Sequence, residues 1–197
     1  AVNPCGEVHF GRRIVSHEDL IVSRVDYTKS AKHTLFGRYL YAHLDTPTNY
    51  DGVNILSASE ADYKRQAQSF VLGDTYLIGS GTVSSFRGTV IRTIADKHTQ
   101  DYFGLSDLGV KGIYLPPGYP KVSLMTVAGG FNIYNAMGVP GYTNSTGVQF
   151  SEDLSTVRGA HQLGFGANFI QTLMNSLSTT STPGNMTFTA INTGLGL

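Results

Sequence analysis

The side chains of this chain that could do acid–base chemistry are two closely spaced pairs of carboxylates. Glu60 lies two positions before Asp62, and Glu152 directly precedes Asp153. A glycoside hydrolase places two carboxylates on either side of the bond that it cleaves. Acids in polar segments are usually solvated surface groups, so these pairs do not by themselves predict catalysis.

Other motifs that could carry chemistry are incomplete. The Gly-Ser-Gly sequence at residues 79–81 lacks the G-x-S-x-G spacing of a nucleophile elbow. His17 and Glu18 are not followed by a second histidine at the spacing of a zinc-binding helix. Cys5 is the only cysteine in the sequence, so no internal disulfide can form. We therefore expect no catalytic residue, no metal site and no cofactor, and hence no enzymatic activity.

Charged side chains also occur inside segments that otherwise alternate like β-strands. They are Arg24, Asp26, Arg38 and Arg87. Strand interiors rarely hold such residues unless the charges are paired or wet. A membrane-crossing strand with one side toward lipid and the other toward a water-filled lumen meets this requirement, because every second side chain faces a polar interior. We therefore expect these four residues to face a lumen.

The pattern that must position these residues is a series of segments in which apolar and polar side chains alternate. Two runs rich in β-branched and aromatic residues between positions 20 and 44 predict a long β-hairpin. The clearest alternation comes later, where Leu163, Phe165, Ala167 and Phe169 share one phase, and we expect these four to face lipid. In all, the sequence predicts six long strands and a short seventh, at residues 19–28, 33–44, 68–78, 83–94, 147–156, 161–177 and 186–191.

The connections between the expected strands alternate in length, as in outer-membrane barrels, which have short periplasmic turns and long extracellular loops. Within the longest connection, residues 121–127 and 131–137 predict a small hairpin. Each run is shorter than the roughly 9 to 11 residues that a crossing strand needs, so we expect no crossing here. The short connections are at residues 28–32, 79–82 and 157–160, and the long ones at 45–67, 96–144 and 178–185.

The bulk composition narrows the class of protein further. Lys plus Arg equal Asp plus Glu at 14 each, so no net charge favours nucleic acid, and we expect no nucleic-acid partner. No apolar run reaches about 18 residues, which excludes a transmembrane helix but leaves transmembrane strands open. The expected fold class is all-β: an antiparallel transmembrane β-barrel segment, a curved meander sheet with short turns at one end and long loops at the other.

Four stretches, taken in order along the chain, resemble one known family. They read SRVDYTKSAKHTLFGRYLYAHL at residues 23–44, QSFVLGDTY at 68–76, SSFR at 84–87 and EDLSTVRGAHQLGFG at 152–166. These stretches are similar to the barrel of TonB-dependent outer-membrane receptors. The resemblance is greatest to the Oar-like group, whose chains begin with a carboxypeptidase-regulatory-like domain.

The resemblance implies a bacterial outer-membrane receptor that imports a ligand through a plugged barrel, energised by contact with TonB. Residues 1–197 would be part of that single barrel domain, with the plug and the TonB box outside them. The expected partners are outer-membrane lipid, the plug domain of the same full-length chain, TonB acting through the missing N-terminal part, and a small ligand that the sequence does not identify, with carbohydrates and peptides as candidates. The lumen charges would contact the plug, line the ligand route, or only hold strands together as a salt-bridge network.

Two other classes of protein fit parts of the pattern. A secreted β-sandwich that binds carbohydrate through aromatic loops would bury the phase of Leu163 and Phe165 in a core. A glycoside hydrolase domain would use its loop acids, with Glu152 as the first residue to test. Dependence of the purified protein on detergent separates the barrel from the sandwich, because only the barrel exposes its apolar phase to lipid.

Overall fold

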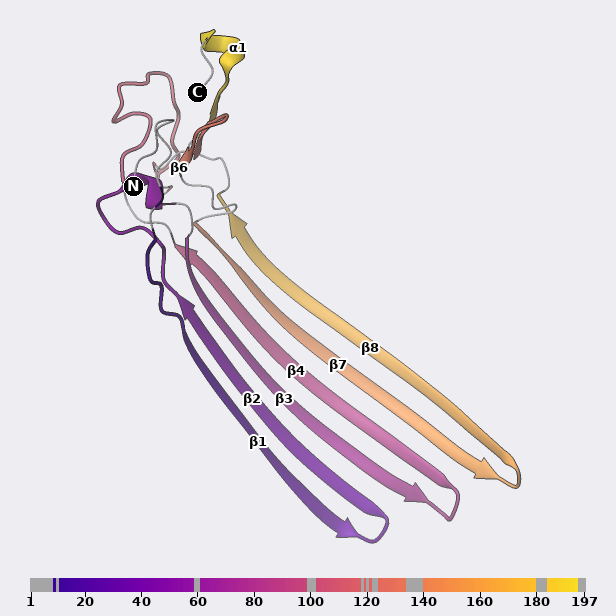
Figure 1. Cartoon of the computed structure of the whole chain (residues 1–197). Coiled ribbons are helices and arrows are strands. Elements are labelled where there is room, and N and C mark those ends of the chain that lie inside the picture. Colours follow the sequence, from indigo (N-terminus) through magenta and orange to yellow (C-terminus); the bar gives the residue numbers. More distant parts are fainter. Residues whose placement is uncertain are drawn as a thin grey trace.

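The main body of the protein is one large antiparallel sheet of six strands in the order β1-β2-β3-β4-β7-β8 (Figure 1). The computed structural model describes residues 9, 11–58, 61–98, 102–117, 119, 121, 124–133, 140–179 and 184–194. The sheet is open, with β1 and β8 as its two edges. The all-β meander predicted from the sequence is confirmed. Its strands are β1 His17–Ser30, β2 His33–Thr46, β3 Asp62–Ile78, β4 Thr82–His98, β7 Gly141–Arg158 and β8 His161–Ser178.

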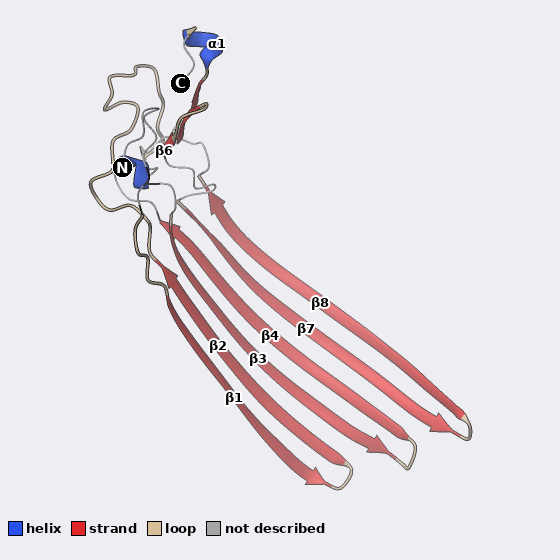
Figure 2. Cartoon of the chain, in the orientation of Figure 1, coloured by secondary structure: helices blue, strands red, loops and turns tan. Residues whose placement is uncertain are grey.

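Tight turns join the strands at one end of the sheet, and long loops join them at the other (Figure 2). The turns occupy residues 31–32, 79–81 and 159–160. Gly79 and Gly159 have φ angles of 71° and 61°, in the left-handed region that glycine adopts without a steric penalty. The predicted alternation of short and long connections is therefore confirmed.

The strands extend further toward the long loops than the apolar pattern predicts. β3 begins at Asp62, where the sequence predicts residue 68, and β7 begins at Gly141, where it predicts residue 147. These extensions carry mostly polar side chains, yet they continue the ladder without a register shift. Backbone N–H and C=O groups need partners whatever side chain they carry. The ladder therefore continues where the alternation of apolar residues has already ended.

A second, three-stranded sheet lies among the long loops (Figure 1). One pair of its strands is the described part of the hairpin predicted around residues 121–137; positions 122–123 and 134–137 lie outside the described residues. β4 pairs directly with β7, so this hairpin is not part of the large sheet, as predicted. The strands are β5 Leu124–Val127, β6 Asn132–Ile133, antiparallel to β5, and β9 Asn185–Phe188, parallel to β5.

The prediction of a strand at residues 186–191 is partly wrong. β9 ends at Phe188, and the short helix α1 (Ala190–Thr193) follows it. β9 pairs with β5, whose last residue is Val127. The ladder therefore ends at the pair of Val127 and Phe188, because no further residue of β5 continues it. The helical turn is closed by Gly194 in the left-handed conformation. Within the described part of the chain, no helix is both long and apolar enough to cross a membrane.

The long loops enclose a small hydrophobic core of their own. The 3-10 helix η1 (Ile55–Ser57) lies next to β6 at this end of the protein. The buried residues of this core come from segments far apart in the sequence, so the loops are packed together. They are Ala61, Leu105, Met125 and Ile133, with Ile55, Leu56, Tyr63, Tyr102, Phe103 and Met186 partly buried against them.

In the large sheet, the ring of Phe36 in β2 lies against Gly73 in β3, directly opposite it. A Cβ atom at Gly73 would overlap three atoms of this ring. Gly88 in β4 differs, because a Cβ atom there would meet its nearest neighbours at 3.6 Å, an ordinary contact. Only glycine therefore leaves room for the Phe36 ring in its observed place.

We predict that Gly73→Ala lowers the free energy of unfolding by about 1 to 3 kcal/mol, the usual cost of overpacking. Gly88→Ala is the matched control and is expected to cost much less. The measurement is urea unfolding of the full-length protein in lipid vesicles. The folded fraction at each urea concentration is monitored by gel electrophoresis, as the fraction whose mobility still changes on heating. Equal costs for the two substitutions would show that the Phe36 ring moves aside freely.

Candidate functional site on one face of the sheet

The register of the large sheet places all four charged residues predicted to face a lumen on the same face. Directly opposed residues of neighbouring antiparallel strands lie on one face. We call this face, and the residues in phase with it on each strand, the polar face. Its two central rows pair Arg24 with Arg38, and Asp26 with Phe36, Gly73 and Arg87 in turn.

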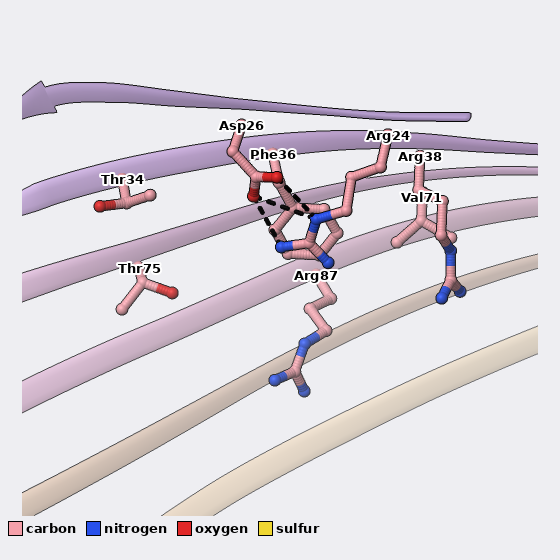
Figure 3. A pocket seen from close by; sticks show the side chains of 8 residues that line it. All are labelled: Arg24, Asp26, Thr34, Phe36, Arg38, Val71, Thr75 and Arg87. Atoms are coloured by element: carbon pink, nitrogen blue, oxygen red, sulfur yellow. Dashed lines mark hydrogen bonds and ion pairs between the residues drawn. The ribbon is translucent and has the colours of Figure 1, made fainter. Parts of the chain in front are cut away.

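These residues surround a pocket of about 430 Å³ that spans the first four strands (Figure 3). The predicted residues come from three different strands, so the sheet brings together side chains that are far apart in the sequence. Sequence reasoning missed the other half of the lining, because it depends on which strands are neighbours. The lining residues are Arg24, Asp26, Thr34, Phe36, Arg38, Val71, Thr75 and Arg87.

Arg24 is held in place on two sides. Its Nε lies 3.0 and 2.9 Å from the two carboxylate oxygens of Asp26, and its Nη2 lies 2.7 Å from Oδ1. Its guanidinium also stacks over the Phe36 ring, 4.3 Å from the centroid. Both charged side chains remain about half exposed, so this pair adds little to stability by itself. It does fix where the Arg24 charge lies.

The other two arginines are less well neutralised. Arg87 Nη1 lies 3.8 Å from Asp153 Oδ2, which is too long for a hydrogen bond. Arg38 has no hydrogen-bond or ion-pair partner among the residues that the structure describes. It also lies directly opposite Arg24, and like charges in that position repel. Among the residues that the structure describes, the positive charge of this pocket is therefore not fully balanced.

The opposite face, the apolar face, carries the four residues that the sequence predicts to face lipid. Leu163, Phe165, Ala167 and Phe169 all share it, since each lies directly opposite a β7 residue of the same face. The three larger side chains are 50%, 63% and 58% exposed in chain order. One row across the sheet carries no charged or hydrogen-bonding side chain: Val25, Gly37, Leu72, Gly88, Phe150 and Phe169. Contact with lipid remains a prediction.

Some charged groups on the apolar face, on both sides of this row, have partners. Toward the turns, His33 Nε2 lies 2.7 Å from Asp74 Oδ1, and Ser84 Oγ donates to Glu152 Oε1 at 2.5 Å. Toward the loops, Arg92 donates to a threonine hydroxyl of the neighbouring strand at 2.7 Å. The alternation in β3 shows from the sequence alone that Asp74 is an exception in an apolar series. Its partner His33 could not be identified that way, because their contact depends on the β2–β3 register. These pairs border the uncharged band.

The carboxylate pairs that could have supported hydrolysis are not brought together. Glu152 lies on the apolar face and Asp153 on the polar face, because neighbouring strand residues point in opposite directions. Of the other pair, Asp62 begins β3 and Glu60 lies outside the described residues. Among the described residues, no group of three His, Cys, Asp or Glu side chains could hold a metal ion.

A smaller pocket of about 300 Å³ lies where β4, β7 and β8 meet the loops. It combines two tyrosines with charged groups from the end of β4. Its lining is Asp96, Lys97, His98, Tyr119, Pro140, Gly141, Tyr142, Leu177 and Thr179.

Carboxylates order the loops at this end. Asp51 accepts backbone N–H groups of Val53 and Asn54, which holds the pKa of its carboxyl below its usual range. Asp107 accepts the N–H of Gly104 at 2.9 Å and pairs with Lys121 Nζ at 2.9 Å. The backbone bond first, and Lys121 second, lower the pKa of Asp107.

Comparison with protein-family models gives a match over most of the chain. Residues 7–196 match a family model described as Outer membrane beta barrel domain. Neither a curated protein nor a solved structure matches the chain. The family match spans both the large sheet and the loops with the small sheet.

We predict that Phe165→Arg destabilises the protein in lipid, because an arginine on the lipid side costs about 2 to 4 kcal/mol at the bilayer midplane and less toward the interfaces. Gly164→Arg is the matched control, because a side chain there points to the polar face, where no atom lies within 4 Å of a Cβ. The measurement is urea unfolding of the full-length protein in vesicles. A membrane-impermeant thiol reagent should also label Val53→Cys in a loop but not Phe165→Cys. Equal labelling of both would show that position 165 does not face lipid.

We also predict that the order of the loop around Asp107 depends on pH. Because the pKa of this carboxyl is lowered on folding, its contribution is complete above its ordinary value of about 3.9 and is lost as the pH falls through the lowered pKa. Asp107→Asn should speed hydrogen exchange of the Gly104 amide at neutral pH. Lys121→Gln should have a smaller effect, since it removes only the lesser of the two interactions that lower the pKa of Asp107. The reverse ranking would contradict this account of the loop.

Proposed function

The chain belongs to the family of the outer membrane beta barrel domain, and we propose that it forms part of the barrel of a TonB-dependent receptor of the Oar-like group. Such a domain lies in the bacterial outer membrane and contacts its lipid. In the proposal, the receptor imports a small ligand, a carbohydrate or a peptide, through a plugged barrel. Contact with TonB supplies the energy.

The observation that carries the proposal is the separation of charged and apolar side chains across a single sheet. Arg24, Arg38 and Arg87 share one face, and large apolar side chains cover the other, with Val25 73% and Leu72 54% exposed. An apolar surface of this extent is unfavourable in water. Lipid on that side and a water-filled lumen on the other satisfy both faces at once.

A large barrel fits the two open edges of the sheet. β1 and β8 each pair on one side only. Unpaired backbone groups in hydrocarbon cost several kcal/mol each, so both edges need partner strands. Barrels of about 22 strands enclose a lumen wide enough for a plug. Two of the stretches that resemble TonB-dependent receptors, residues 23–44 and 152–166, each contain one of the tight turns of this sheet.

In this proposal the polar face meets the lumen and the plug domain of the same full-length chain, and import is not enzymatic. Transport through a plugged barrel requires binding and displacement, not bond cleavage. The opposite orientation of Glu152 and Asp153 supports this view, because two carboxylates on opposite faces cannot flank one bond. The same geometry disfavours the glycoside hydrolase alternative.

The secreted β-sandwich alternative is wrong. A sandwich needs a second sheet packed on the apolar face. In the described residues the only other sheet is the three-stranded one, which lies among the loops at the strand ends (Figure 1). Membership of an outer-membrane family also excludes a secreted module.

We predict that the full-length protein, purified in detergent, binds the purified periplasmic domain of TonB from the same bacterium. The physical reason is that plug release needs a mechanical partner on the periplasmic side. Binding is measured on immobilised TonB, and a porin from the same membrane serves as the control. Retention equal to that of the porin would remove TonB dependence while leaving the outer-membrane barrel intact.

A further inference from the structure

We propose that the pocket on the polar face binds the carboxylate or phosphate group of a small organic ligand. The inference deepens the import function proposed above and rests on it for the idea that this anion belongs to the imported ligand. Binding itself is a property of the pocket and can be tested without transport.

The first argument is the charge balance of the lining. Three arginines and one aspartate line the pocket, a surplus of two positive charges. The one acid, Asp26, is already engaged by Arg24 through both of its oxygens. Among the described residues, Arg38 is left without a carboxylate partner, and Arg87 has only the more distant Asp153.

The nearest further acid does not remove this surplus. Asp153 lies 3.8 Å from Arg87, and its carboxylate extends toward Gly166 of β8, where a Cβ atom would be only 2.6 Å from Oδ1. Gly166 thus leaves room for the acid to lie toward β8, on the side away from Arg38. Even with Asp153 included, the cluster of three arginines and two aspartates stays positive.

The second argument is the arrangement of donors. Arg38 lies directly opposite Arg24, and this repulsion is relieved when an anion binds between the two strands. Guanidinium groups bind carboxylate and phosphate oxygens with two parallel hydrogen bonds. Thr34 and Thr75 lie opposite each other at the same pocket and add neutral hydroxyl donors. The pocket therefore offers hydrogen-bond donors on several sides of one anion.

The third argument is size. A volume of about 430 Å³ is within the range of small-molecule sites and exceeds what an inorganic ion fills. The ring of Phe36 and the side chain of Val71 add apolar surface for the body of the ligand. These features favour a small organic anion over a single carboxylate of the plug domain as the occupant of the pocket. A plug carboxylate bound there would block the pocket to added ligands.

The test uses three pyranose sugars that differ only in the group at C6: glucose, glucuronate and glucose 6-phosphate. Each is titrated by calorimetry into the full-length protein purified in detergent. We expect glucuronate, glucose 6-phosphate or both to bind more tightly than glucose, and comparing the two anions separates a carboxylate from a phosphate preference. No binding of either anion beyond that of glucose would overturn the proposal, and would be the result if the plug filled the pocket.

Variants locate the site. Arg38→Gln should weaken binding of the preferred anion at least about tenfold, since hydrogen bonds to charged groups are strong, and Arg38→Lys should have an intermediate effect. The matched control is Arg65→Gln, on the same face but stacked on Tyr63 and six residues along the strand from Val71, about 20 Å away. Its effect should stay within about twofold, because salt screens charges over such a distance. Equal losses for Arg38→Gln and Arg65→Gln would overturn the proposal.

Asp26→Asn gives a prediction of opposite sign. It raises the surplus charge and frees Arg24, so anion binding should become severalfold tighter. A salt-bridge network that only holds strands together predicts no gain, and an unchanged or weaker affinity would contradict the proposal. Heat-modifiable gel mobility establishes that each variant is folded. If anion binding occurs but TonB binding does not, the transport function fails and the anion site stands.

Discussion

An unbroken register of backbone hydrogen bonds is the constraint on which the rest of this structure depends. In the described strands of the large sheet, the one register shift falls between Thr28 and Ser30, beside a turn. A slip of one residue anywhere else would move every side chain of a strand to the other face. The charges of β1, β2 and β4 share a face only because three successive ladders stay in phase. The same register keeps the apolar face free of charge along its central row.

Given that separation, the two faces need different surroundings. Charged side chains on a single-layered sheet are tolerated when water or partner groups reach them. Arg24 has two partners, the carboxylate of Asp26 and the ring of Phe36, and its side chain is half exposed. Phe36 in turn lies against Gly73, so the absence of a side chain on β3 helps to decide where an arginine of β1 is held. Polar groups and packing are therefore coupled on this face.

The loop end of the protein follows a different rule. Parallel pairing of β5 with β9 joins segments on either side of β7 and β8, and a small core holds them together. Loops carry much of the specificity of proteins built on rigid sheets. Here they are packed and ordered by carboxylates such as Asp107, while the sheet carries the pocket.

The sequence by itself determined the strands of the large sheet, the turns between them and the phase of the strands other than β3, whose phase is ambiguous because Asp74 lies in an otherwise apolar series. These features are local, since a period of two and a tight turn can be read within a few residues. It therefore identified Arg24, Asp26, Arg38 and Arg87 as a set and Leu163 to Phe169 as the opposite phase. It also excluded crossing strands in the longest loop, because length is a local property too.

Only the tertiary structure decided which residues became neighbours across strands. Thr75 joins the pocket through the β2–β3 register, and β4 pairs with β7 across a long insertion. The sequence also could not predict where the strands end near the loops, because backbone pairing continues there through residues with polar side chains. The parallel partner of β9 is equally non-local. Lateral pairing depends on hydrogen bonds between distant segments, and the periodicity of a single strand carries no record of its partner.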